Sequence, residues 1–346
     1  MKNKGLVVAL MALVALTMLF GIEKRASFAA STEWKIQIPF PGPFWKGQIN
    51  HFAKFVAERT KRQLALKVLP QGSVLSIPKI ADGVAQNVIQ IGFSASIFSA
   101  GKVPEMNLLH GIPFLYDSRD QMIEVVYSYK DGAVFKLLQR AFKEKVKAYY
   151  MGYGLTGMNG LFGNFRVSSI GDIKGKKIKS TGAANGLIAQ LGGSPISLPG
   201  SELYTAFQRG TIDGTVYPFH AIRSYKLTEV VKNIVFPPFY PGTEGGVYCN
   251  ISAFEKLPAS VQADLKQACI DWAKNEFTPA ALAYSAGAVD QIVKSGITKN
   301  DFSDADIKKL RKIVVEKVLP RYIKKTPRCQ ELWGLIEAYC KEKGLL

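Results

Sequence analysis

Apolar residues along this chain recur alternately at intervals of about two and about 3.6 residues, which is the pattern of strands and helices in succession. In the first half, this pattern predicts strands over 34–40, 64–69, 88–93 and 146–151, and helices over 47–62, 77–86 and 120–144. Strands that alternate with helices indicate an α/β architecture.

The segment 174–218 predicts two further strand-to-helix crossings within a short stretch. In order, it contains a basic strand (176–180), Thr181 and Gly182, a helix (183–190), a strand (195–199), Ser201 as the expected N-cap of a helix (202–208), Gly210 as its stop, and a strand (211–217). The first amides of each helix lack partners within the helix and point past the strand end. Such helix starts are suited to hold a small anion.

The succession of elements predicts two lobes. A Gly- and Phe-rich passage follows Gly152, an extended run begins at Gly245, and the pattern over 258–296 is helical almost without a break. Two crossings between lobes, near Gly152 and Gly245, would make each lobe discontinuous and join them by a hinge. We therefore predict a helix that crosses or backs both lobes. The expected division is lobe I over 31–153 and 246–286, lobe II over 154–245 and 287–320, and a C-terminal helical segment over 321–346.

The first 29 residues have the features of a secretory signal peptide. Two lysines precede an apolar run over 6–22, and small residues follow it up to an expected cleavage site after Ala29. The alternative is a permanent N-terminal anchor, because the apolar run is nearly long enough to span a bilayer. In either case the remaining residues, about 317, are expected outside the cytoplasm, and they are enough for two lobes.

Charge and cysteines narrow the classes of partner. The formal charge is +18, and about +15 remains without the predicted signal peptide. The basic residues are spread along the chain rather than clustered in one segment. No nucleic-acid recognition motif is present, so attraction of anionic solutes or of a negatively charged membrane surface fits better. Four cysteines, which permit either disulfides or buried free thiols, do not match the spacing of a metal site: Cys249, Cys269, Cys329 and Cys340.

The sequence has no complete motif for nucleotide binding or catalysis. Residues 152–157 match G-x-G-x-x-G after a strand, but the following residues have no helical period, so they do not predict a dinucleotide site. Neither a G-x-S-x-G motif nor paired carboxylates are seen. The three histidines lie apart in sequence, and of His51, His110 and His220 only the last is near the predicted crevice. The sequence therefore predicts no enzyme, cofactor or metal centre.

Lys179 is the residue that the pattern places best for binding an anion. It ends a strand beside a helix N-terminus, which is where ligands collect in open α/β sheets. Alternation puts Lys177 on the same face and Ile178 on the other. The alternative is a solvated lysine, like its neighbours Lys174 and Lys176.

These residues resemble the solute-binding proteins of TRAP transporters, the tripartite ATP-independent periplasmic transporters. The resemblance covers 34 to about 268 and is strongest in DIKGKKIKSTG (172–182), LPGSELYTAFQRGTIDGT (198–215), IQIGFSAS (89–96) and IPFLYDSRDQ (112–121). With Thr156 and Gly157, the segment 198–215 looks most like the 2-oxoacid-binding branch. The resemblance implies a type II-like periplasmic binding fold, whose two α/β lobes close on an organic acid and deliver it to membrane subunits.

The chain departs from that branch at four positions. The family's carboxylate-binding arginine corresponds to Lys179, which offers a compact charge instead of a planar, two-pronged donor. The branch's glutamine corresponds to Asn159, and its Glu-Trp pair to Val216 and Tyr217. Loss of that glutamate removes an oxygen with which the branch holds a cation, so metal-assisted binding of a 2-oxoacid is not predicted.

The sequence thus predicts a periplasmic protein that captures a small organic anion, a monocarboxylate with an apolar or aromatic body. The expected binding residues are Lys179 for the carboxylate, the amides near Thr181 and Gly182, Asn159, and Tyr217 against the body, with Phe44, Trp45 and Ser96 as weaker first-lobe candidates. Phe44 and Trp45 are expected in the loop before the first helix. A secreted enzyme acting on small acids, or a receptor that presents its ligand to a membrane sensor, are the alternatives. The oligomeric state is left open.

Overall fold

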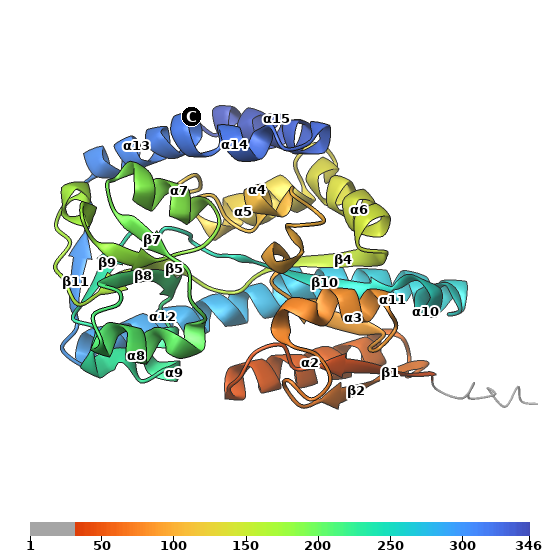
Figure 1. The fold of residues 1–346 in the computed structure, drawn as a ribbon. Coiled ribbons are helices and arrows are strands. Elements are labelled where there is room, and N and C mark those ends of the chain that lie inside the picture. Colours follow the sequence, from red (N-terminus) through yellow and green to blue (C-terminus); the bar gives the residue numbers. More distant parts are fainter. Residues whose placement is uncertain (1–31) are drawn as a thin grey trace, which may run out of the picture. The chain divides into compact units, whose positions relative to one another are not determined.

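Three sheets organise residues 32–346, the part of the chain that this computed structural model describes (Figure 1). Their strand orders are β1-β2, β3-β10-β4 and β11-β9-β5-β8-β6-β7. The predicted signal peptide and its cleavage site lie outside the described residues. Residues 33–346 form one compact unit, which contains both lobes of the fold.

The first lobe is built on the two smaller sheets. Their strands are β1 (Thr32–Gln37), β2 (Leu64–Leu69), β3 (Ile91–Ser94), β4 (Ala148–Leu155) and β10 (Glu244–Asn250). Helix α2 (Pro43–Arg59) lies against β2 and buries Ile49, Phe52 and Val56, which recur at helical spacing on one face. These side chains join a core that also contains Trp272 and Phe277 from a later helix.

The second lobe is built on the six-stranded sheet. Its strands are β5 (Asn159–Gly163), β6 (Lys177–Lys179), β7 (Ser194–Ile196), β8 (Gly214–Pro218), β9 (Asn233–Phe236) and β11 (Thr298–Asp301). β6 is parallel to both β7 and β8, whereas β5 is antiparallel to β8. The predicted α/β architecture with two lobes is confirmed, and the lobe boundaries remain predictions.

Helices cover both faces of the second-lobe sheet. On one face, Val216 and Ile178 pack with α7 (Ala183–Gln190) in a large core. On the other face, the core joins Phe162 of β5 to α8 (Leu203–Gln208), α9 (Ala221–Ser224) and α12 (Thr278–Lys294). Side chains alternate between these two faces along each strand.

The helical run predicted over 258–296 is confirmed as a nearly continuous element. It consists of α11 (Ala259–Asp271), the π-helical segment η6 (Trp272–Phe277) and α12. α11 contacts α2, η6 contacts β4, and α12 contacts α9 (Figure 1). The run therefore backs both lobes, as the sequence predicts.

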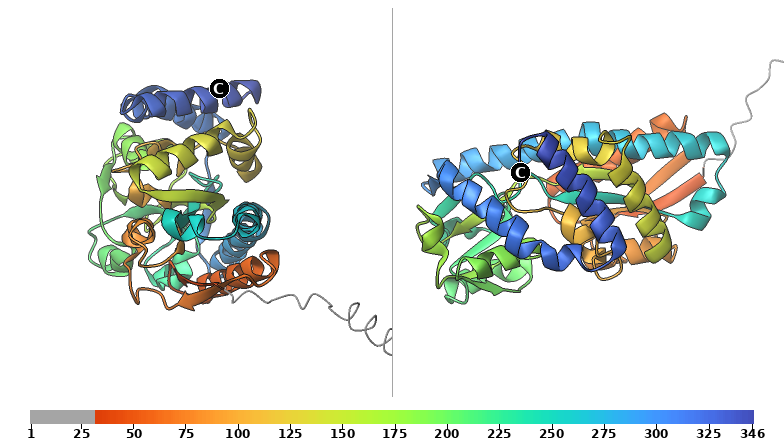
Figure 2. Two further views of the ribbon diagram at one scale, coloured as in Figure 1. Left: turned by 90° about the vertical axis from the view of Figure 1, so that its right-hand side faces the viewer. Right: turned by 90° about the horizontal axis from the view of Figure 1, so that it is seen from above.

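The C-terminal helices form a second connection between the lobes. They are α13 (Asp304–Ile313), η7 (Val314–Val318), α14 (Pro320–Ile323) and α15 (Pro327–Glu342). The right-hand view of Figure 2 shows them from above, in dark blue, following one another along the chain. α13 and η7 contact α7 of the second lobe, while α15 contacts α6 (Ala133–Lys145) of the first. Within 321–346, α14 and α15 are helical, and the division of this segment from the lobes remains a prediction.

The remaining helical elements are short or lie on the first lobe. They are η1 (Ile77–Lys79), α3 (Ile80–Ala85), η2 (Ser96–Ser99), α4 (Met106–Leu109), α5 (Arg119–Tyr127), η3 (Ile170–Ile173), η4 (Gly200–Glu202), η5 (Leu227–Glu229) and α10 (Ile251–Glu255). No helix among the described residues is long and apolar enough to cross a membrane.

Three local predictions are wrong. The helix expected over 120–144 is two helices, α5 and α6, because Lys130, Asp131 and Gly132 between them adopt positive φ values. Ser201 does not cap α8, since it lies within the short η4 turn and gives no capping hydrogen bond. Helix α2 begins four residues earlier than predicted, since Pro43 suits the first helical turn.

The four cysteines are buried free thiols. Cys329 and Cys340 share helix α15, so they are too far apart to bridge. Burial raises the pKa of the Cys249 thiol well above its ordinary value. Of the two alternatives that the sequence leaves open, the structure has the free thiols.

Candidate functional site

Lys179 is a buried lysine at the carboxyl end of β6. Its side chain is 3% exposed, whereas Lys177, on the same strand, is exposed. The Nζ atom lies 4.0 Å from the centre of the Tyr217 ring. Among the described residues, no carboxylate forms an ion pair with Lys179, and its Nζ atom donates no hydrogen bond. A buried ammonium held only against an aromatic face is available to an anion from outside the chain.

Burial lowers the pKa of Lys179 from its ordinary value to about 8, because the charged form loses hydration without gaining an acidic partner. The ammonium is therefore still largely protonated at neutral pH. Burial raises the pKa of the Tyr217 phenol well above its ordinary range, so this side chain stays neutral. The pair consequently presents one positive charge beside an apolar ring.

Strand pairing explains why these two side chains meet. In the parallel ladder, Lys179 pairs with Thr215 of β8, and Tyr217 lies two residues further along the same strand. Side chains two residues apart share a face, so Lys179, Thr215 and Tyr217 line one side of the sheet. The Thr215 hydroxyl is buried without a hydrogen-bond partner in the described residues, so it is a further polar group next to the lysine.

The backbone past the end of β6 has the geometry expected of an anion site. Gly182 precedes α7 with φ 57° and ψ −133°, a conformation that favours glycine. Its carbonyl accepts a hydrogen bond from the Tyr322 hydroxyl at 2.9 Å, which fixes the turn. Within the described chain, the amides of Thr181 and Gly182 donate no hydrogen bond, so they can take part in binding.

Asn159 lies at the same edge of the sheet but on the opposite face. It pairs with Pro218, while Gly160 pairs with Tyr217. Because directly paired residues point to the same side, the Asn159 side chain is directed away from the face of Tyr217. Its Oδ1 atom is buried without a partner in the described residues. The structure therefore brings the side chains of Lys179 and Tyr217 together. Asn159 lies near them in the sheet, but its side chain is on the other face.

The first-lobe candidates have different environments. Phe44 stacks on Tyr284 with ring centres 4.4 Å apart, in the first turn of α2 rather than in the loop that the sequence predicts. Trp45, in the same turn, is 6% exposed and packs against Phe93 and Phe277 as a core residue. Of this pair, Phe44 is the one with a partly open ring.

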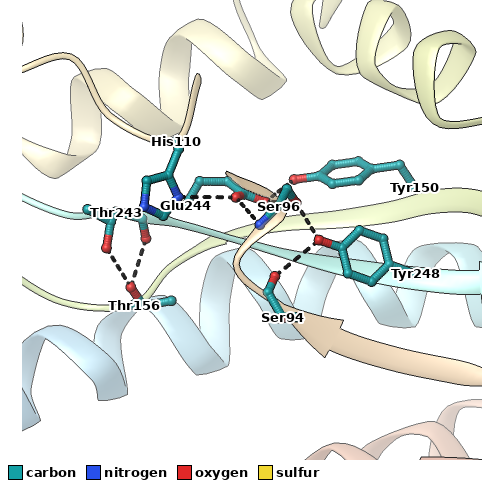
Figure 3. A network of polar contacts seen from close by, with 8 residues as sticks. All are labelled: Ser94, Ser96, His110, Tyr150, Thr156, Thr243, Glu244 and Tyr248. Carbon is teal, nitrogen blue, oxygen red and sulfur yellow. Dashed lines mark hydrogen bonds and ion pairs between the residues drawn. The ribbon is translucent and has the colours of Figure 1, made fainter. Parts of the chain in front are cut away.

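Ser96 belongs to a buried polar network around Glu244 (Figure 3). Glu244 is completely buried, and Ser96 donates to it through its backbone amide at 2.8 Å and its hydroxyl at 2.5 Å. Tyr150 donates a third hydrogen bond at 2.7 Å, and His110 Nδ1 lies 3.6 Å from the carboxylate. The Ser96 hydroxyl is also 2.6 Å from that of Tyr248, so it is fully engaged within the protein.

The network lies at the paired ends of β4 and β10, near the positions where the sequence predicts that the chain passes between the lobes. Glu244 begins β10 and pairs with Leu155, the last residue of β4, and the hydroxyls of Thr156 and Thr243 are 2.7 Å apart at this crossing (Figure 3). Glu244 is not among the residues predicted from the sequence, because the burial of this carboxylate depends on contacts with elements far apart in the chain. An acid within the otherwise apolar and glycine-rich extended run after Gly242 is the signal that could have found it.

Val216 occupies the position where the 2-oxoacid branch has a glutamate, and its surroundings are apolar. It is 4% exposed and pairs with Leu161, on the face that packs against α7. Among residues 32–346, no cluster of three or more histidine, cysteine, aspartate or glutamate side chains is arranged to hold a metal ion.

Comparison with known proteins identifies the family of the chain. A family model described as bacterial extracellular solute-binding protein, family 7, matches residues 41–325. A solute-binding protein of Albidiferax ferrireducens is 24% identical over 97% of this chain and 99% of its own length. A monocarboxylate 2-oxoacid-binding periplasmic protein of a Nostoc species is 25% identical over 63% of this chain and 60% of its own length.

A solved structure has the same fold. The crystal structure of a TRAP periplasmic solute-binding protein from Desulfovibrio salexigens with bound orotic acid has a TM-score of 0.78, with 25% identity over 91% of this chain and 99% of that one. The family consists of periplasmic solute-binding receptors, so the prediction that the chain is not an enzyme is confirmed by its relatives. The chain belongs to family 7 of the bacterial extracellular solute-binding proteins, the receptors that serve TRAP transporters.

Proposed function

We propose that this receptor captures a small organic monocarboxylate with an apolar or aromatic body. The observation that carries the proposal is Lys179, a buried ammonium that has no acidic partner among the described residues. The carboxylate would replace the lost hydration of Nζ and accept hydrogen bonds from the amides of Thr181 and Gly182. Tyr217 would pack against the ligand body, as its ring already forms one side of the lysine's surroundings.

Closure of the two lobes strengthens this single charge contact. Water screens an ion pair, and its exclusion lowers the effective dielectric constant around the lysine and carboxylate. The run α11–η6–α12 and the C-terminal helices contact both lobes and would carry the hinge movement. In this proposal, the signal peptide directs export to the periplasm and is cleaved after Ala29. The receptor would then deliver its ligand from the periplasm to the membrane subunits of a TRAP transporter.

A thermal-shift screen of the mature chain tests this function. We expect aliphatic and aromatic monocarboxylates to raise the melting temperature, and matched primary amides to leave it unchanged, because the amides carry no charge for Lys179. Each compound is screened with and without sodium and calcium ions. Stabilisation by amides and acids alike would contradict the proposal, and stabilisation that requires a cation would contradict the reading of Val216.

Ligand affinity is expected to fall at alkaline pH. A bound carboxylate favours the ammonium form, so binding raises the pKa of Lys179 above its value of about 8 in the free protein. Affinity is then level below about pH 7, where both states are protonated, and falls by up to about tenfold per unit above about pH 8, where binding must take up a proton.

Isothermal titration calorimetry from about pH 6.5 to about pH 9.5 measures this effect. The matched control is Lys179→Arg, whose guanidinium stays charged over the whole range. We expect that variant to show no alkaline loss of affinity. A wild-type affinity that stays level up to the highest pH would show that Lys179 does not pair with the ligand.

A further inference from the structure

His220 is a half-buried polar residue that has no role in the binding of the carboxylate by Lys179. It follows β8 after a single intervening residue, Phe219, and precedes the short helix α9. Its Nδ1 atom is buried and has no hydrogen-bond partner among the described residues. Phe219 is completely buried in the second-lobe core, so it anchors the backbone that positions the imidazole.

One aromatic ring from another element, Tyr284, approaches the imidazole, and that ring in turn contacts Phe44. The His220 ring centre is 5.4 Å from that of Tyr284 on α12, and Tyr284 in turn stacks on Phe44 of α2. Tyr284 is 38% exposed although its ring contacts two others. His220 therefore lies where the second lobe, the long helical run and the first lobe meet, on the same chain segment that carries Tyr217 against Lys179.

The chemistry of this environment favours a neutral imidazole. No described carboxylate forms an ion pair with His220, and burial lowers its pKa to about 4. A neutral imidazole offers one donor and one acceptor and no charge. A buried polar atom without a partner is unfavourable, so an atom such as Nδ1 is normally satisfied by a water molecule or a ligand.

Charge at the site limits what the ligand can be. Lys179 is the one buried lysine or arginine among the residues that the structure describes. A second carboxylate that met His220 and the Tyr284 ring would gain no charged partner from either group, because the imidazole is neutral. A hydroxyl or carbonyl group can hydrogen-bond to a neutral imidazole without that penalty.

We propose that His220 is a specificity-determining residue that hydrogen-bonds a hydroxyl or carbonyl group on the ligand body, while Lys179 holds the carboxylate. This inference rests on the proposed function and narrows its ligand class to monocarboxylates that carry one neutral polar group away from the carboxylate. In this proposal, Tyr284, which contacts the His220 ring and stacks on Phe44, would pack against the ligand body. Purely apolar acids bind through the carboxylate alone and are the weaker ligands.

Matched pairs of acids test the role of His220. The probes are benzoate and phenylacetate, each compared with its ortho-, meta- and para-hydroxylated derivatives, with affinities measured by calorimetry. For the wild-type protein, we expect the best-placed hydroxyl to improve affinity by about tenfold. In His220→Phe, which keeps a ring of similar size, we expect that improvement to disappear while affinity for the unsubstituted acid stays within about threefold.

Two further variants separate the possible failures. His220→Gln retains a donor and an acceptor and is expected to recover part of the preference, and circular dichroism confirms that each variant is folded. Lys179→Met is expected to lose affinity for both acids of every pair. An undiminished preference for the hydroxylated acid in His220→Phe, an equal loss for both members of a pair, or the absence of any preference in the wild type would overturn the inference. Failure of the wild type to bind any carboxylate would instead overturn the proposed function, and this inference with it.

Discussion

Replacement of Lys179 by methionine is expected to lower affinity for the organic acid by about 100-fold or more, which is about 2.7 kcal/mol. The same substitution should leave the unliganded protein as stable as the wild type or more stable. Burial depresses the pKa of Lys179 from 10.5 to about 8, so the folded state holds the ammonium less favourably than the unfolded chain does. That penalty is fully present below about pH 8 and disappears as the pH rises through about 10.5.

The separation of binding from stability distinguishes a ligand-binding lysine from a structural one. A lysine that held the fold together would reduce the free energy of unfolding when removed. The matched control is Lys177→Met, on the same strand but exposed, for which we expect affinity within about twofold of the wild type. Calorimetry for the ligand and urea unfolding for the free protein measure the two effects. A destabilised Lys179→Met protein that binds ligand normally would refute the assignment.

Replacement of Glu244 by alanine is expected to have the largest effect on stability. The carboxylate is completely buried and accepts hydrogen bonds from the Ser96 amide, the Ser96 hydroxyl and the Tyr150 hydroxyl. Its removal leaves the Ser96 amide and the Tyr150 hydroxyl buried without an acceptor, and we expect a loss of about 3 kcal/mol or more in the free energy of unfolding. Urea unfolding at neutral pH measures the loss.

Tyr150→Phe is the matched control for Glu244, because it removes one donor and keeps the carboxylate. It should cost about 1 kcal/mol, the usual contribution of one hydrogen bond. We expect both variants to bind ligand when folded, since the network fixes the crossing between β4 and β10 rather than the carboxylate site. A Glu244→Ala protein as stable as the wild type would show that the network contributes nothing to the fold.

The sequence predicts the architecture well because the relevant signals are local. The period of apolar residues marks each strand and helix, and the near-unbroken pattern over 258–296 corresponds to the run from α11 to α12. The errors also have local causes. A stretch of left-handed backbone at 130–132 divides the helix expected over 120–144, and proline at 43 begins α2 before the apolar period becomes visible.

The site is predicted only in part because several of its features depend on tertiary contacts. Position at a strand end is enough to single out Lys179, and register with β8 explains its contact with Tyr217. Burial of Trp45 in the core and the use of the Ser96 hydroxyl by Glu244 depend on elements far apart in sequence. No local pattern reports such contacts, so these two candidates could not be separated from Phe44 in advance.

Mass spectrometry of the ligand released from the purified receptor, followed by rebinding, tests the central claim most directly. We predict that the released compound is a monocarboxylic acid, that it rebinds without chemical change, and that its primary amide binds at least about 100-fold more weakly because Lys179 then has no charged partner. An amide that binds as tightly as the acid, or a released ligand without a carboxylate, would contradict the account.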